Sequence, residues 1–179
     1  DIAKLLSILQ SESLWFSHPL SFEDPYEGLY TENTAKRIVE DMGDMGIAED
    51  YTKKDAMIGN MSSYISSWNL KSSQSVALWE KYIQGSNGVA IKSTIGEVRR
   101  SINLADLNRQ SVYDFEIIKD KVDYYPEQDD GRPRGIYAPI FTKRDIFEFE
   151  SEYRFAITSD QLMNESIALD VMGIPGQLY

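Results

Sequence analysis

The residues best suited to chemistry form a short run in which Glu150, Glu152 and Arg154 are spaced two apart. They lie in Phe147–Ile157, where apolar and charged side chains alternate. Alternation is typical of a half-buried strand, because successive strand side chains point to opposite faces. We therefore predict a strand over Phe147–Ile157. It would present the two carboxylates and the guanidinium as a ladder, each about 6.5–7 Å from the next.

Two interpretations of this ladder stay open. It could be a solvated strand face in which Arg154 pairs with a neighbouring carboxylate, or it could be a catalytic or binding site. The planar guanidinium favours bidentate pairing with a carboxylate. We expect Arg154 to be largely buried and paired with a carboxylate from a distant segment, with Asp24 and Glu27 as the favoured partners.

A second acidic group lies early in the chain, where Asp24 precedes Pro25 and Glu27 follows Tyr26. The simplest interpretation is a turn that Asp24 caps and Pro25 sets. The alternative is that Asp24 and Glu27 join the two later glutamates in space. Converging carboxylates suit Mg²⁺ or Mn²⁺, and such a site would serve a metal-dependent nuclease or phosphodiesterase.

The residue content of the chain excludes several classes of catalytic site and limits the candidates for others. There is no cysteine, so thiol catalysis and thiolate zinc sites are excluded. His18 is the only histidine, and it is a candidate general base or a structural residue beside Pro19. The sequence contains no Gly-x-Ser-x-Gly elbow and no Walker A or Rossmann glycine pattern.

Two further candidates are Tyr82 and Lys143. Trp79 and Tyr82 share a predicted helix and are expected in the core, although Tyr82 could present its hydroxyl to a site. Lys143 is expected to be solvated together with Arg144, or to contact an anion.

Charge limits the partners of the chain. The 179 residues include 18 basic and 29 acidic side chains, a formal net charge of −11. This charge opposes binding to an extended nucleic acid, so a small nucleotide or a basic protein is the more compatible partner. No apolar run approaches the about 18 residues of a membrane span, and we expect a cytoplasmic protein without a membrane partner.

The sequence patterns around these residues indicate both helices and strands. They predict one α+β domain over residues 1–179, with a mixed or antiparallel sheet and several packed helices. Helices are expected at Ile2–Gln10, Thr34–Met42, Lys53–Asn60, Val76–Ile83 and Gly96–Ile102. The other strands are expected at Leu14–Ser17, Ser62–Trp68, Gly88–Ser93, within Ser111–Tyr124, and at Ile167–Val171. Residues 31–60 are expected to be a variable helical insertion, and a few residues are expected to be missing at one or both ends.

Four segments in this order resemble the bacterial domain-of-unknown-function 2971 family. They are LWFSHPLSFEDPYEG, SVALWEKYIQGSNGVAIKS, VDY and FTKRDIFEFESEYRF, and they cover Leu14–Ile157. Glu23 stands where the family usually has asparagine, and Phe147 where tryptophan is common. The family name carries no activity, so this resemblance implies a fold and a candidate residue set only.

The Glu-x-Glu spacing also resembles an element of mono-ADP-ribosyltransferases, in which the second glutamate, here Glu152, stabilises positive charge on the ribose as nicotinamide leaves. Ser66–Trp68 resembles that fold's serine-containing strand. His18 lies near the position of its early Arg or His. This resemblance implies an ADP-ribosyltransferase-like transferase or glycohydrolase that uses NAD as a toxin or defence effector. The catalytic candidates are Glu150, Glu152 and His18, and the substrate-binding candidates are Ser66, Trp68, Tyr82, Lys143 and Arg154. A metal-dependent enzyme and a non-enzymatic binding module stay open as alternatives.

Overall fold

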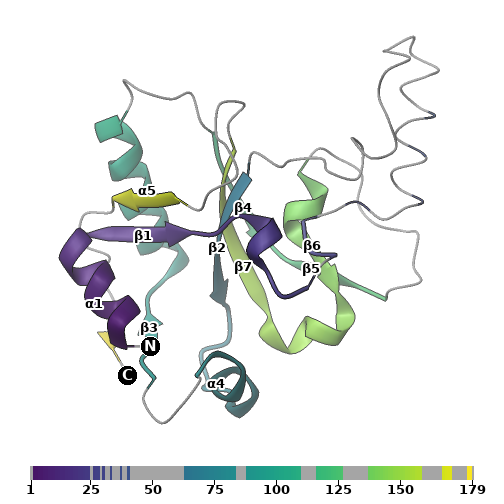
Figure 1. Cartoon of the computed structure of the whole chain (residues 1–179), viewed down its shortest axis with the longest axis horizontal. Helices are drawn as coiled ribbons and strands as arrows, with labels where there is room; N and C mark the ends of the chain where they lie inside the picture. The colour runs from purple at the N-terminus through teal and green to yellow at the C-terminus, as the bar shows by residue number, and fades with distance from the viewer. Residues whose placement is uncertain are drawn as a thin grey trace. The chain divides into compact units, whose positions relative to one another are not determined.

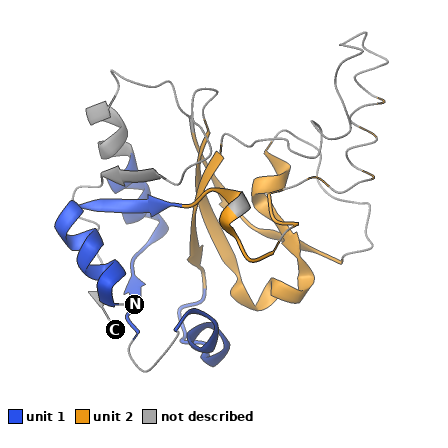
Figure 2. Cartoon of the chain, in the orientation of Figure 1, with its two compact units in different colours: residues 1–16, 71–114, 166–179 blue, residues 17–70, 115–165 orange. Residues whose placement is uncertain are grey.

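The computed structural model describes residues 2–24, 26–28, 30, 33, 37, 40, 63–83, 88–109, 116–126, 137–158, 167–170 and 177–178 (Figure 1). The chain divides into two compact units that interleave along the sequence (Figure 2). Unit 1 comprises residues 1–16, 71–114 and 166–179, and unit 2 comprises residues 17–70 and 115–165. Helices and strands are mixed along the chain and the largest sheet is antiparallel, which agrees with the predicted α+β class.

Unit 2 is built on a three-stranded antiparallel sheet in the order β2–β7–β4. Its strands are β2 (Ser63–Asn69), β7 (Glu152–Thr158) and β4 (Glu116–Lys121). β7 is the central strand, and most of its side chains are buried on both faces. The other elements that the structure bounds in this unit are η1 (Pro19–Ser21), β5 (Asp123–Tyr125), η2 (Ala138–Phe141), β6 (Thr142–Arg144) and η3 (Asp145–Glu150). β5 and β6 pair in parallel.

The two faces of this sheet differ in chemistry, because alternate residues of β7 point to opposite sides. One face, called the charged face below, carries Glu152, Arg154 and Ala156 of β7. The other, called the aromatic face, carries Tyr153, Phe155 and Ile157. On the charged face the apolar core joins Ile65, Ile140 and Ala156, with Phe22, Ile118, Tyr137 and Phe141 packed against them.

The prediction of a strand over Phe147–Ile157 is wrong for the first half of that segment. The segment preceding β7 is the 3₁₀ helix η3, and β7 begins only at Glu152. Ser151 joins the two in a left-handed conformation, with φ 45° and ψ 59°. The 3₁₀ helix turns Glu150 back toward the buried ammonium of Lys143, a partner that the alternating pattern cannot reveal. Glu150 therefore leaves the predicted ladder.

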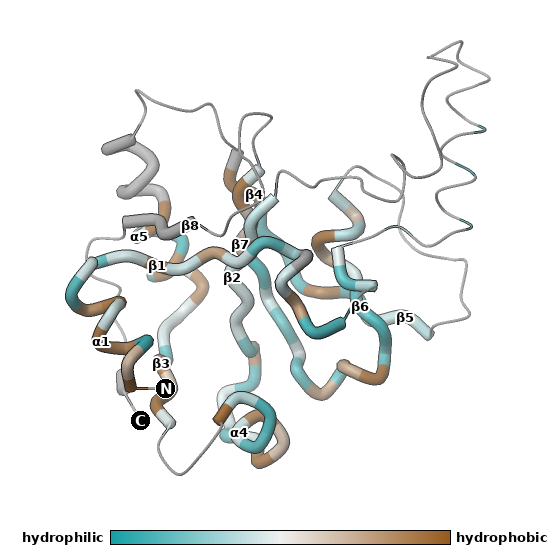
Figure 3. The backbone as a smooth tube through the Cα atoms, in the orientation of Figure 1, coloured by the Kyte–Doolittle hydropathy of each residue, from teal (hydrophilic) through white to brown (hydrophobic). Residues whose placement is uncertain are grey.

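Unit 1 contains helices and two short strand pairs. Its elements are α1 (Ile2–Ser11), β1 (Ser13–Phe16), α4 (Val76–Tyr82), β3 (Ile91–Lys92), α5 (Ile95–Arg109), β8 (Ile167–Asp170) and β9 (Gln177–Leu178). β1 pairs with β8 and β3 with β9, both antiparallel. Figure 3 shows hydrophobic segments along α1, where Leu6 and Leu9 are at least half exposed.

The predicted helices near Ile2–Gln10 and Val76–Ile83 are confirmed, and the one near Gly96–Ile102 extends to Arg109. The strand predicted at Gly88–Ser93 is much shorter. Of the predicted insertion over residues 31–60, the structure describes residues 33, 37 and 40, all helical, and the remainder lies outside the described residues. Within the described part of the chain, no helix has the length and apolar character needed to cross a bilayer.

Candidate functional site: a buried charge cluster

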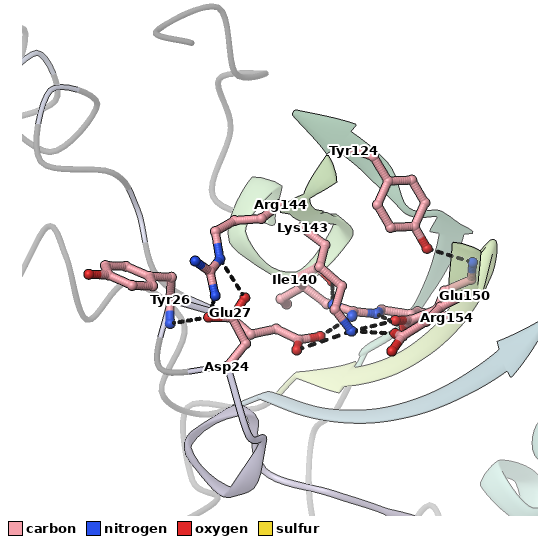
Figure 4. Close-up of polar contacts among 10 residues, drawn as sticks. Asp24, Tyr26, Glu27, Tyr124, Ile140, Lys143, Arg144, Glu150 and Arg154 are labelled. Carbon is pink, nitrogen blue, oxygen red and sulfur yellow. Dashed lines mark hydrogen bonds and ion pairs between the residues drawn. The ribbon is translucent and has the colours of Figure 1, made fainter. Parts of the chain in front are cut away.

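Five charged side chains contact one another on the charged face of unit 2, and Figure 4 shows how four of them, Glu27, Lys143, Glu150 and Arg154, point toward one another. This group, called the buried charge cluster below, consists of Glu27, Lys143, Glu150, Glu152 and Arg154. Each of the five residues is at most 7% exposed. Burying an ion without a partner costs several kcal/mol or more, so the pairing among these five side chains decides whether the unit is stable.

Lys143 lies at the centre of the cluster. Its Nζ donates to Oε2 of Glu150 at 2.6 Å and to Oε1 of Glu152 at 2.7 Å. It also forms an ion pair with Oε2 of Glu27 at 3.3 Å. Burial alone would lower the pKa of this ammonium, but the charges of Glu27 and Glu152 outweigh it and raise the pKa above its usual value. Lys143 is therefore a permanent cation, and the predicted solvated location is wrong.

Arg154 is fully buried, and its donors point in three directions. Nε donates to Oε2 of Glu152 at 2.8 Å, and Nη1 donates to the carbonyl oxygen of Ile140 at 2.7 Å. Nη2 forms a hydrogen-bonded ion pair with Oε1 of Glu27. Burial opposes the charge of this guanidinium, yet Glu152 and Glu27 raise its pKa. The predicted burial and distant carboxylate partner are both confirmed, with Glu27 as that partner.

Asp24 binds a different cation. Nη2 and Nε of Arg144 donate to its two carboxylate oxygens at 3.0 and 3.1 Å. The backbone N–H of Tyr26 also donates to Asp24 at 3.1 Å, so the predicted turn cap is confirmed. The guanidinium of Arg144 lies 5.1 Å from the ring centroid of Tyr26 and 5.6 Å from that of Phe147. Asp24 thus holds the turn beside the cluster.

Glu152 joins both cations of the cluster. Burial alone would raise the pKa of its carboxyl group. The charge of Arg154, hydrogen bonds with Glu150 and Arg154, and the charge of Lys143 together lower the pKa well below its usual range. Glu152 is consequently an ionised carboxylate at neutral pH despite its burial.

The side chains of Tyr124 and Asn69 form hydrogen bonds with the backbone of Glu152 and Glu150. The N–H of Glu152 donates to the Tyr124 hydroxyl at 2.8 Å, and Nδ2 of Asn69 donates to the carbonyl oxygen of Glu150. Burial raises the pKa of Tyr124 to about 12. Sequence analysis missed both residues, and Asn69 belongs to no motif. The VDY segment that contains Tyr124 was the available signal.

The predicted convergence of carboxylates is confirmed for Glu27, Glu150 and Glu152, since all three contact Lys143. The ammonium lies among the oxygens that a metal ion would need. Among the residues that the structure describes, no group of three or more histidine, aspartate and glutamate side chains is arranged to hold a metal.

Other candidates lie away from the cluster. Ser66 and Trp68 pair with Phe155 and Tyr153 across β2 and β7, so they belong to the aromatic face and share no face with Glu152. His18 is buried, with its ring edge-on to Tyr64 at 5.5 Å.

Tyr82 belongs to α4 of unit 1. The residue is 62% exposed, so its predicted place in the core is wrong. The ammonium of Lys81 lies 5.5 Å from the centroid of its ring.

No protein-family model, curated protein or solved structure matches the chain. The two family resemblances therefore stay predictions from sequence motifs.

Proposed function

We propose that the chain is a nucleotide-directed enzyme, a transferase or glycohydrolase that breaks the bond between nicotinamide and ribose in NAD. Glu152 is the charge-stabilising carboxylate. The observation that carries this proposal is that Glu152 is buried and yet held ionised by Lys143 and Arg154. Strongly perturbed ionisable groups gather at functional sites.

The reaction needs a fixed negative charge. As the N-glycosidic bond breaks, nicotinamide leaves with the bonding electron pair and positive charge develops on the ribose. Water or an acceptor nucleophile then adds to the ribose carbon and releases its proton to solvent. A carboxylate stabilises this charge most strongly in a site of low dielectric constant. Glu152 supplies such a charge, because Arg154 and Lys143 hold its carboxyl group ionised.

Solvent borders the cluster on the β2 side. Asn69 lies directly across from Glu152, and Ser67 lies across from Arg154. Both β2 residues are exposed although their β7 partners are buried. A ligand that approaches over this end of β2 would meet Glu152, the one carboxylate of β7.

The test is nicotinamide release from NAD, measured by chromatography for the wild type, Glu152→Gln and Glu148→Gln. Glutamine keeps the shape of the side chain and removes its charge, so Glu152→Gln should lower kcat at least about 100-fold. Glu148→Gln removes a charge from an exposed position of η3 and should leave the rate unchanged.

Circular dichroism would confirm that each variant is folded. The proposal fails if the folded wild type neither binds NAD nor releases nicotinamide, or if Glu152→Gln retains the wild-type rate.

A non-enzymatic binding module is the second candidate. It is favoured because each charged member of the cluster bonds to another member, as expected of a purely architectural network. In that case, substitution of exposed acidic residues would change capture of a basic partner while no turnover of NAD is measured in any variant.

A further inference from the structure

The aromatic face of the unit 2 sheet carries basic and aromatic side chains side by side. Trp68 of β2 pairs with Tyr153 of β7, which pairs with Lys121 of β4. In the next row, Phe155 pairs with Ser66 on one side and Lys119 on the other. Directly paired residues of antiparallel strands point to the same face. We call Trp68, Tyr153, Lys119 and Lys121 the aromatic–lysine surface.

The two rings of this surface are held in place by neighbours. The indole Nε1 of Trp68 donates to Oγ of Ser66 at 3.1 Å, and Ser66 is itself buried. The Tyr153 ring packs edge-on against Phe155, with centroids 5.4 Å apart, and Phe155 is 1% exposed. Trp68 and Tyr153 keep part of their surface open to solvent. Such fixed and partly open rings need little reorganisation to receive a flat ligand.

The two lysines give this surface a local positive charge in a chain that is acidic as a whole. Lys121 is exposed and Lys119 is half-buried, and among the described residues neither ammonium has an ion-pair partner. The chain as a whole carries a formal net charge of −11. Lys119 and Lys121, beside the rings of Trp68 and Tyr153, therefore make this part of an acidic chain complementary to an anion.

We propose that the aromatic–lysine surface binds a mononucleotide. The base stacks on Trp68 and Tyr153, and the phosphate is bound by Lys121 and Lys119. Aromatic residues on a sheet face stack bases without regard to sequence. Adjacent strands lie about 4.8 Å apart, so a lysine side chain of β4 reaches the phosphate of a base placed over β7. A single phosphate group suits the net charge of the chain, whereas a polyanion is repelled.

This site is separate from the proposed active site, because Glu152 points to the opposite face of the sheet. The experiment is isothermal titration calorimetry of the full chain with AMP, adenosine, ribose 5-phosphate and a short single-stranded oligonucleotide. AMP should bind more tightly than either fragment, since each fragment lacks one of the two contacts. Glu152→Gln should leave AMP affinity unchanged.

Two variants locate the binding. Lys121→Glu reverses a charge at an exposed position and should weaken AMP binding at least about tenfold, while Arg99→Glu, on the exposed surface of α5, should not change it. Trp68→Leu should cost about 5- to 150-fold through lost stacking. If Trp68→Leu does not fold, Lys121→Glu alone decides.

The assignment is overturned if the wild type does not bind AMP at millimolar concentration, or if Lys121→Glu binds it as tightly as the wild type. It is equally overturned if the oligonucleotide binds more than tenfold more tightly than AMP.

Discussion

Arg154 donates to three acceptors from three different parts of unit 2. They are the Glu152 carboxylate on the same strand, the Ile140 carbonyl in η2, and the Glu27 carboxylate in the early turn. A planar guanidinium can satisfy such a set because its donors form a rigid fork. The charge is fully buried, so any acceptor that loses its partner remains without solvent to replace it.

Replacement of Arg154 should therefore destabilise the fold strongly. Arg154→Met leaves Glu27 and Glu152 with Lys143 as their remaining cation, and we expect a loss of about 3–5 kcal/mol in the free energy of unfolding. The melting temperature should fall by roughly 6–20 °C, as followed by circular dichroism. Arg154→Lys should recover little of this loss, because one ammonium cannot reproduce the fork.

A matched control is Arg100→Met. Arg100 pairs with Glu97 at 2.6 Å, but its side chain is 66% exposed, and the expected cost is about 0–1 kcal/mol. A loss of similar size in both variants would show that Arg154 contributes no more than a surface pair.

Tyr124 gives the site a signature at high pH. Burial raises its pKa from 10.0 to about 12, so the folded state holds the phenolic proton more tightly than the unfolded state. The contribution of this pKa difference to the free energy of unfolding is fully present below pH 10 and is lost as the pH rises toward 12. In an ultraviolet titration, one tyrosine should ionise late in the wild type.

Tyr124→Phe removes the titrating group. The late ionisation step should therefore be absent from the titration of the variant, and the free energy of unfolding of the variant should fall less between pH 10 and 12 than that of the wild type. An unchanged titration curve in Tyr124→Phe would assign the late step to another tyrosine and contradict the described environment.

At the scale of elements, the junction between η3 and β7 decides which glutamates share a face. Ser151 has a positive φ of 45°, and its carbonyl oxygen accepts the Leu70 N–H at 2.9 Å. The left-handed conformation costs a non-glycine residue about 1–2 kcal/mol. This single residue reverses the chain so that Glu150 contacts Lys143 from the 3₁₀ helix and Glu152 contacts it from the strand.

Substitutions at Ser151 should follow this conformation. Ser151→Gly should raise the free energy of unfolding by about 0.5–1 kcal/mol, because relief of strain exceeds the added chain entropy. Ser151→Val should lower it by more than about 1 kcal/mol, since a β-branched residue is a marked outlier there. Urea denaturation measures both values.

Ser67→Gly is the matched control, because Ser67 is an exposed serine in the regular strand β2. Glycine there should destabilise the fold by about 0.5–1 kcal/mol. If Ser151→Gly is destabilising to the same degree, the junction is not strained.

The sequence predicts β7 from Glu152 onward because the alternation there matches a real strand. It fails over Phe147–Glu150, where the same alternation occurs in the 3₁₀ helix η3. Local pattern cannot distinguish the two, because the deciding contact is made by Lys143, outside the alternating segment. The position of Ser66 and Trp68 was likewise unpredictable, since the face of β2 depends on its register with β7.

At the scale of the whole molecule, the buried charge cluster joins segments that are distant in sequence. Glu27 and Arg154 are 127 residues apart, and unit 2 is assembled from residues 17–70 and 115–165. Sequence reasoning identified Arg154 as buried and Glu27 as one of two favoured partners. It could not choose between Asp24 and Glu27, because that choice depends on Arg144 binding Asp24.

The central claim is that the Glu27–Arg154 pair joins the early turn to the central strand of the sheet. A double-mutant cycle of Glu27→Gln and Arg154→Met, followed by urea denaturation of all four proteins, tests it most directly. We predict a coupling energy of at least about 2 kcal/mol, near the upper end for residues in one buried network. Additivity within about 0.5 kcal/mol would contradict the claim, because the two side chains would then contribute to stability independently.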